Sequence, residues 1–176
     1  VYTKTAYDSP LFSGAYANAL ADFNNDGQLD LLVHQYQGYT YLLTGNGDGT
    51  FHPPVGPIAN FLIGYYSEDI KTADLNGDGN IDVIRPEYYY GVGVYFGNGD
   101  GTFKPRQQLS SASSYAISVE VTDIDGVDGP DIIIGDAGSS YLATYLNDGS
   151  GNASVAGWQL LYSYAGYYAT DVHVAD

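Results

Sequence analysis

The chain repeats itself at a step of 52 residues. The segment ADFNNDGQLD at residues 21–30 returns as ADLNGDGNID at residues 73–82. A second motif, GNGDGTF, occupies residues 45–51 and recurs without change at 97–103, again 52 residues on. A fixed period of about 50 residues is typical of stacked supersecondary units, none of which buries its apolar face alone.

A third, weaker copy follows at a step of 49, with TDIDGVDGPD at residues 122–131 and LNDGSG at residues 146–151. The chain stops at residues 174–176, where a fourth copy would begin. We therefore expect one repeat domain over residues 1–176: an outer strand of a preceding unit at 1–13, units at 14–61, 62–112 and 113–161, and the first strand of a further unit at 162–176.

Each unit alternates turn-rich segments with short runs of β-branched and aromatic residues. No window sustains a 3.6-residue apolar period over ten or more residues, so no substantial helix is expected. Strands are predicted at the apolar runs 31–36, 39–43, 92–96, 117–121, 132–134 and 141–146. Four antiparallel strands in roughly 50 residues is the size of a propeller blade. The predicted fold class is all-β, a partial propeller of about three blades or part of an assembly.

The two motifs, in register at this period, resemble the FG-GAP or VCBS repeat family, which includes the calcium-binding blades of the integrin α-subunit propeller and many secreted bacterial proteins. The resemblance covers nearly the whole chain. It implies a β-propeller with calcium bound between the first and second strands of a blade.

The Asp-rich loops have the composition of sites for a hard divalent cation. Ca²⁺ takes about six to eight oxygen ligands, and a tight loop with oxygens at positions 1, 3, 5 and 9 wraps one ion. Gly at position 6 permits the left-handed φ that curls the chain. The expected ligands are Asp22, Asn24, Asp26, Asp30 and the Gln28 carbonyl in the first loop, and Asp74, Asn76, Asp78, Asp82 and the Asn80 carbonyl in the second.

Three other interpretations compete with this one. An EF-hand needs an acidic residue at position 12, where this chain has Val33, Arg85 and Ile134. Dockerin-type repeats use a similar loop on helices and at a shorter step. A solvated turn, rich in Asp, Asn and Gly for conformational reasons alone, is the third alternative. We favour the metal site because turn chemistry by itself gives no reason for Asp30 and Asp82 at identical offsets.

The third loop departs from the pattern. Asp123, Asp125 and Asp131 hold positions 1, 3 and 9, but position 5 is Val127 and Asp128 falls one place late. A rearranged loop would bring Asp128 to a metal, and a vacant or weak site is the alternative. Two calcium sites are therefore expected, and the third is left open.

Charge and residue chemistry exclude several function classes. The net charge of −16 repels phosphate backbones and anionic headgroups, so we expect no nucleic-acid or membrane-surface partner. No apolar run approaches the roughly 18 residues needed to span a bilayer, so no membrane insertion is expected. No Cys is available as nucleophile or thiolate ligand. The three histidines, His34, His52 and His173, occupy unrelated repeat positions and form no visible triad. We expect the chain not to be an enzyme.

Tyrosine is in excess, with 19 residues. In a four-stranded blade, the loop into the first strand and the turn between the second and third strands share one face, and the tyrosines favour it. Tyr combines a rigid apolar plate with a polar tip, which suits sugar rings and protein partners, although aromatics also pack between blades. The candidate ligand-binding residues are Tyr39, Tyr65, Tyr66, Tyr88, Tyr89, Tyr90 and Tyr115.

Three repeats cannot close a propeller, since closed propellers have about four or more blades. We therefore expect either a fragment of a longer protein or copies that associate through open blade edges. The expected function is a secreted or cell-surface, calcium-stabilised module for adhesion or for binding a carbohydrate or protein. The alternatives are an accessory propeller of a polysaccharide-degrading enzyme and a structural subunit of an extracellular assembly.

Overall fold

The computed structural model describes residues 14–59, 61, 69–87, 89–109, 115–138, 141–150, 155, 158–164 and 172. Within this part of the chain every regular element is a β-strand. No helix there is long and apolar enough to cross a membrane. The strand content agrees with the missing helical period, so the all-β prediction is confirmed.

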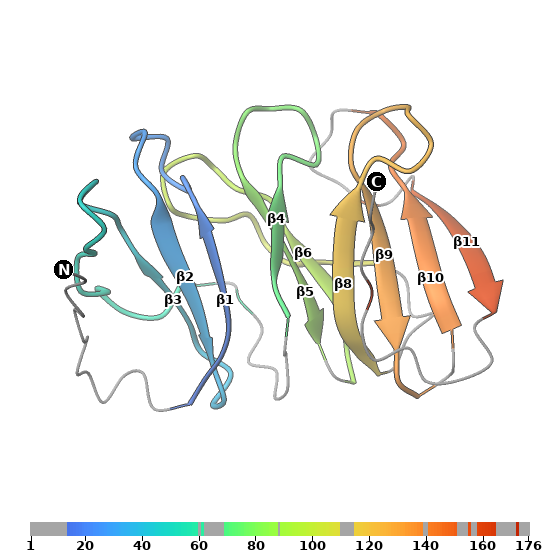
Figure 1. Cartoon of the computed structure of the whole chain (residues 1–176), viewed down its shortest axis with the longest axis horizontal. Helices are drawn as coiled ribbons and strands as arrows, with labels where there is room; N and C mark the ends of the chain where they lie inside the picture. The colour runs from blue at the N-terminus through green and yellow to red at the C-terminus, as the bar shows by residue number, and fades with distance from the viewer. Residues whose placement is uncertain are drawn as a thin grey trace, which may run out of the picture.

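Three antiparallel sheets follow one another along the chain, and Figure 1 shows them side by side. The first blade contains β1 (Ala15–Ala21), β2 (Asp30–Gln35) and β3 (Thr40–Leu43). The second contains β4 (Lys71–Ala73), β5 (Asp82–Glu87), β6 (Gly91–Tyr95) and β7 (Gln107–Leu109). The third contains β8 (Ala116–Thr122), β9 (Asp131–Asp136), β10 (Tyr141–Leu146) and β11 (Gln159–Tyr164). Each sheet pairs its strands in chain order, as propeller-type blades do.

The first blade departs from the expected four strands. Its fourth segment pairs with β3 only through the single bridge of Tyr41 with Pro57, next to a hydrogen bond from Ile58 N to Thr40 O at 2.7 Å. Pro53, Pro54 and Pro57 lie in this segment and carry no backbone N–H. A longer ladder therefore lacks donors there.

The third blade also differs from the expected boundary. Residue 161 was predicted to end this unit, but β11 continues to Tyr164 and pairs along the whole of β10, from Leu146 opposite Gln159 to Tyr141 opposite Tyr164. Backbone hydrogen bonding is satisfied over more residues in this way.

Neighbouring blades bury their strands on both faces. Every residue of β5 and β6 is buried. Along β5 the side chains alternate, so that Val83 joins the apolar cluster shared with Leu32 of the first blade, and Ile84 joins the cluster shared with Ile132 of the third. Blade-to-blade packing, rather than a single central layer, therefore holds the described residues together.

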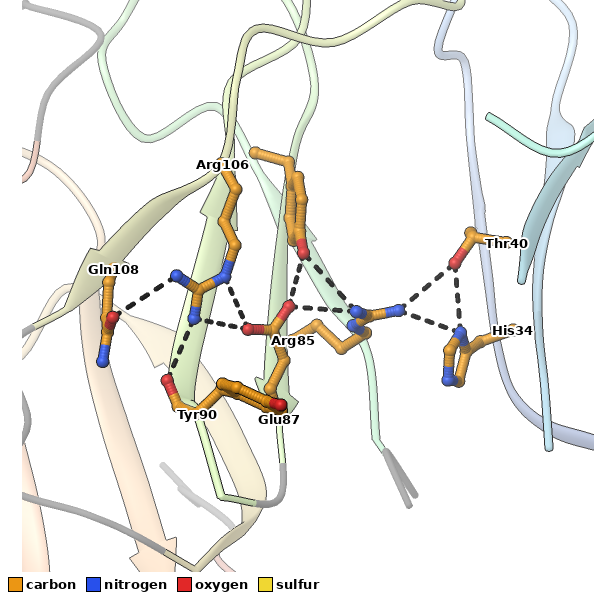
Figure 2. Close-up of polar contacts among 8 residues, drawn as sticks. His34, Thr40, Arg85, Glu87, Tyr90, Arg106 and Gln108 are labelled. Atoms are coloured by element: carbon orange, nitrogen blue, oxygen red, sulfur yellow. Dashed lines mark hydrogen bonds and ion pairs between the residues drawn. The ribbon is translucent and has the colours of Figure 1, made fainter. Parts of the chain in front are cut away.

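The joint between the first and second blades also contains a buried charged pair. Arg85 NH2 lies 2.9 Å from Glu87 Oε1, and neither side chain is exposed. Glu87 additionally accepts hydrogen bonds from Arg106 Nε at 2.6 Å and from the Tyr95 hydroxyl. Figure 2 shows this carboxylate between two guanidinium groups. The single carboxylate of Glu87 thus forms ion pairs with both Arg85 and Arg106.

Arg85 extends the polar network into the first blade. Its NH1 donates to His34 Nδ1 at 2.9 Å and to Thr40 Oγ1 at 3.2 Å (Figure 2). Guanidinium has donors only, so Nδ1 of His34 must be the unprotonated ring nitrogen. The equivalent positions of the other two repeats hold Val33 and Ile134. The Arg85 contacts are therefore particular to one blade joint.

Candidate functional site

The loop between β1 and β2 curls around its own Asp and Asn side chains. Asp22 accepts from Asp26 N at 3.1 Å and from Gly27 N at 2.8 Å. Asn24 Oδ1 accepts from Asp26 N at 3.0 Å, and Asp26 Oδ1 accepts from Gln28 N at 2.8 Å. Side-chain oxygens at positions 1, 3 and 5 are thus directed inward by the backbone of the loop itself.

The loop between β4 and β5 repeats this pattern. Asp74 accepts from Asp78 N at 3.1 Å and Gly79 N at 2.8 Å, Asn76 from Asp78 N at 3.1 Å, and Asp78 from Asn80 N at 2.9 Å. The sequence repeat is therefore also a repeat of geometry.

The last Asp of each loop has a structural task that the sequence did not reveal. Asp30 is buried and accepts from Phe23 N at 3.0 Å and from Gly45 N at 2.9 Å. Asp82 does the same with Leu75 N and Gly97 N, at 2.9 and 2.8 Å. Each carboxylate fastens its loop to the start of the GNGDGTF hairpin. These bonds give the identical offsets a structural reason that is independent of a metal, so the offsets by themselves do not distinguish a metal site from a hydrogen-bonded loop.

These buried carboxylates are costly in their ionised form. Burial raises the pKa of Asp82 to about 6, and it also raises the pKa of Asp30. The neighbouring carboxylates Asp78 and Asp74 act on Asp82 in the same direction, against the two backbone hydrogen bonds. The loop thus concentrates negative charge beside a carboxylate that is already poorly solvated.

The loop between β8 and β9 brings three carboxylates together. Oxygens of Asp123, Asp125 and Asp131 lie within 4.8 Å of one another. Asp131 is also fastened like its counterparts, through Ile124 N at 2.8 Å and Asn147 N at 2.8 Å. Such a triangle of oxygens is the kind of donor set that a hard divalent cation takes.

Asp128, the displaced residue of this loop, lies elsewhere. It has a left-handed φ of 66°, and its carboxyl lies against Gly149, where an added Cβ would be 2.4 Å from Oδ1. Asp128 is outside the carboxylate triangle. The shift of one residue therefore turns this side chain toward the hairpin instead of the loop centre.

All side chains predicted as metal ligands are Asp or Asn, and their oxygens match the preference of Ca²⁺. In the first two loops position 3 is Asn, which adds a neutral amide oxygen instead of a fourth charge. Gln28 and Asn80 lie at position 7. The participation of their carbonyls stays a prediction, as does each ligand assignment.

The GNGDGTF hairpin supports the loop that precedes it. Gly45 lies so close to the loop that an added Cβ would be 2.2 Å from Leu29 O. Within the hairpin, Thr50 donates to Asp48 through both its N–H and its hydroxyl. The unchanged sequence of this hairpin in two repeats indicated that it makes a close contact. It did not indicate which residues the hairpin contacts.

Tyrosines collect at the end of the blades opposite the Asp loops. In Figure 1 the Asp loops lie at the upper edge and the turns that follow β2, β5 and β9 at the lower edge. Tyr36 N donates to Gly14 O at 2.8 Å, and the Tyr16 and Tyr36 rings stack with centroids 5.4 Å apart. The loop into β1 and the turn after β2 therefore share a face, as expected.

Exposed rings continue onto the second blade. Tyr89 is 65% and Tyr90 50% exposed, and Tyr89 meets Tyr115 edge-on with centroids 5.6 Å apart. Tyr89 has a left-handed φ of 73°, which is uncommon for a residue other than Gly. Tyr39 is 39% exposed. The remaining predicted residues, Tyr65, Tyr66 and Tyr88, lie outside the described residues.

Other tyrosines do pack between blades. Tyr95 and Tyr145 are at most 3% exposed, in clusters shared by neighbouring blades, and Tyr95 stacks on Phe61 with centroids 4.0 Å apart. Tyr41 is 6% exposed, in a cluster of first-blade residues. The packing interpretation thus holds for Tyr95 and Tyr145, whereas Tyr16 in β1 and the turn residues Tyr36, Tyr39, Tyr89 and Tyr90 are exposed. Sequence reasoning did not separate these two groups.

The histidines lie in different surroundings. His34 is buried at the blade joint, His52 is exposed, and His173 is outside the described residues. The expectation that the chain is not an enzyme stays a prediction.

A family model for FG-GAP-like repeats matches residues 22–85 and 74–126, more than half of the chain. Each match begins at the first Asp of a loop, Asp22 or Asp74. The chain belongs to the FG-GAP-like repeat family. Its blades, loops and hairpins are accordingly FG-GAP-like repeats in sequence and β-propeller-type blades in structure.

A solved structure similar to this FG-GAP-like chain is a lectin of Agrocybe aegerita, whose description concerns specific recognition of non-reducing terminal N-acetylglucosamine. The TM-score is 0.63 at 22% sequence identity, over 90% of this chain and 41% of the lectin chain. The chain thus spans less than half the length of that lectin. The likeness supports the propeller-type fold. Comparison with curated protein sequences gave no match.

Proposed function

We propose that this chain is a calcium-stabilised, extracellular carbohydrate-binding module. The observation that carries the proposal is the separation of its two ends, with inward-facing Asp and Asn oxygens at one and exposed tyrosines at the other. The lectin with the same fold, described by its recognition of terminal N-acetylglucosamine, supports a sugar as the ligand class. An accessory role beside a polysaccharide-degrading domain is compatible with the same binding face.

The calcium part of the proposal rests on the loops. Asp22, Asn24 and Asp26 direct oxygens into the first loop, and the second loop repeats this arrangement. A cation there offsets the repulsion among these carboxylates and the unfavourable burial of Asp82. Extracellular calcium modules have Kd values of about 10⁻⁴ to 10⁻³ M, which suits the millimolar calcium outside cells.

Calcium is expected to raise the melting temperature of the protein and EDTA to lower it. Each site contributes roughly 0.4–1.4 kcal/mol at millimolar calcium, because the ion binds the folded state only. Thermal unfolding in calcium, in magnesium and in EDTA measures this. Magnesium should stabilise less, since it requires a stricter octahedron. Equal melting temperatures in calcium and EDTA would contradict the assignment.

Removing a loop carboxylate should remove a calcium ion. Asp26→Ala and Asp78→Ala are each expected to lower the calorimetric calcium stoichiometry by about one, because each deletes the position-5 oxygen of one loop. Asp128→Ala serves as the matched control and should change little, since Asp128 lies against Gly149. Equal losses in all three variants would show that Asp128 is a ligand after all.

The carbohydrate part of the proposal rests on the exposed rings. Aromatic plates stack on the apolar faces of sugar rings while their hydroxyl groups hydrogen-bond to the sugar. Tyr89 is held in a left-handed backbone conformation with its ring largely exposed. Such a conformation costs about 1–3 kcal/mol and is retained more often at binding sites than elsewhere. Arg106 NH2 donates to Tyr90 O at 2.9 Å and fixes the same turn.

A glycan array in calcium-containing buffer is expected to show binding to sugars with accessible apolar ring faces. Tyr89→Ala and Tyr90→Ala should each weaken binding by about tenfold or more, the loss of one stacked ring. Val55→Ala, at a fully exposed apolar residue outside the tyrosine turns, is the control and should bind normally. A silent array, or equal effects of all three variants, would contradict the proposed face.

A further inference from the structure

The two joints between neighbouring blades use the same acceptor, with a backbone donor at one joint and a side-chain donor at the other. The backbone carbonyl at loop position 2 accepts a hydrogen bond from the hairpin of the following blade. Phe23 O accepts from Gly101 N at 2.9 Å, and Leu75 O accepts from Asn147 Nδ2 at 2.7 Å. Phe23 and Leu75 are 2% exposed. The loop end of one blade is thus covered by the hairpin end of the next.

In the third blade, the Asp loop that would form such a joint is exposed. Ile124 occupies position 2 of the third loop, equivalent to Phe23 and Leu75, yet it is 47% exposed. Val127 in the same loop is 53% exposed. An apolar side chain that is buried in two of three equivalent places is therefore open to solvent in the last one.

In the first blade, the hairpin that would form the other side of such a joint is exposed. Its GNGDGTF hairpin, residues 45–51, is identical in sequence to residues 97–103 of the second blade. An added Cβ at Gly101 would lie 3.0 Å from Leu42 of the neighbouring blade, whereas at Gly49 it would meet nothing within 4 Å. The same hairpin is therefore covered in one blade and open in the other.

An apolar hollow lies beside the open hairpin. It has a volume of about 500 Å³ and is lined by Leu20, Leu29, Gly47, Gly49, Thr50 and Phe51, among others. Leu29 is 61% exposed, while its repeat equivalent Ile81 packs partly buried against the cluster shared with the first blade. The hollow therefore has the position and composition of a blade contact with one side missing.

We propose that a second copy of this chain fills the hollow, inserting the Ile124 loop end of its third blade against the hairpin and Leu29 of the first. The contact is head-to-tail, because the two halves are different surfaces at opposite ends of the array. Its geometry continues the joints already seen between the first, second and third blades. Two copies supply six blades, within the about four to eight of closed propellers.

The salt dependence of the association offers a further readout. Each copy carries a net charge of −16, so association should tighten as salt screens the repulsion between copies. The proposal depends on neither calcium nor carbohydrate binding.

Light scattering after size exclusion should give twice the chain mass of 18.8 kDa for the unaltered 176-residue protein. Leu29→Glu and Ile124→Glu should each weaken association by at least about tenfold, because each places a carboxylate in an apolar contact. Val55→Glu makes the same kind of change at a fully exposed residue outside the hollow and should leave the dimer intact. Leu20→Glu, in the same hollow, repeats the test if Leu29→Glu lowers stability.

Mixing the two variants distinguishes a head-to-tail contact from other associations. The Leu29→Glu chain keeps its Ile124 end and the Ile124→Glu chain keeps its Leu29 end, so an equimolar mixture should form a heterodimer with one joint. A monomeric unaltered protein, variants that dimerise normally, or a mixture that stays monomeric would each overturn the proposal. A blade from elsewhere in a longer chain, or an unrelated partner, would then be the occupant.

Discussion

Replacing Glu87 with Ala is expected to lower the free energy of unfolding by about 3–5 kcal/mol, the usual cost of removing one partner from a buried ion pair. The carboxylate lies between Arg85 and Arg106, and the Arg85 side chain is fully buried. Without Glu87, two positive charges remain near one another in a blade joint that excludes water. Chemical denaturation followed by circular dichroism measures the loss.

The matched control is Glu120→Ala, the same substitution in a partly exposed ion pair with Lys71 at 3.2 Å. Its expected cost is about 0–1 kcal/mol, as for other exposed pairs. Glu87→Gln should fall between the two variants, because the amide keeps an acceptor and loses the charge. Similar costs for Glu87→Ala and Glu120→Ala would show that the buried charges are better hydrated than their geometry implies.

Replacing Asp82 with Ala should destabilise the protein by about 2–6 kcal/mol even when calcium is absent. The substitution leaves Leu75 N and Gly97 N without their acceptor, at about 1–3 kcal/mol for each buried unsatisfied group. Asp82→Asn should cost less, since the amide oxygen still accepts one of the two hydrogen bonds. Denaturation in EDTA separates this role from any contribution of a bound ion.

Asp78→Ala is the control for this experiment, because Asp78 lies in the same loop but is exposed. In EDTA it should cost well under half as much as Asp82→Ala, whereas in calcium both variants lose the ion. If the two variants were equally stable in EDTA, the terminal Asp would act only through metal and not by fastening the hairpin.

The sequence alone determined the blade architecture, because motifs repeated at a fixed step specify structurally equivalent units. Two motifs at a step of 52 residues required equivalent units. The β-branched runs within them predicted β2, β3, β6, β8, β9 and β10 to within two residues. Local chemistry also placed the Asp loops and hairpins correctly, since Gly, Asn and Asp favour the turns observed there. The family membership follows from these same residues.

Contacts between distant residues needed the tertiary structure. Sequence reasoning used Arg85 only to reject an EF-hand and gave Glu87 no role, yet the two form the charged centre of a blade joint. A charged residue in an apolar strand has the same spacing whether it faces solvent or another blade, so burial could not be read from the pattern. The separation of turn tyrosines from buried Tyr95 and Tyr145 has the same origin.

The role of the terminal Asp shows this division most clearly. Its offset in the sequence is equally compatible with a metal ligand and with a hydrogen-bond acceptor for a second motif 15 residues away. Only the fold brings Gly45 N to Asp30 and Gly97 N to Asp82. Local propensity therefore specified each loop and hairpin, whereas their docking, the charged joint and the exposed blade ends were decided by packing across the chain, because side-chain burial depends on neighbours that sequence spacing does not encode.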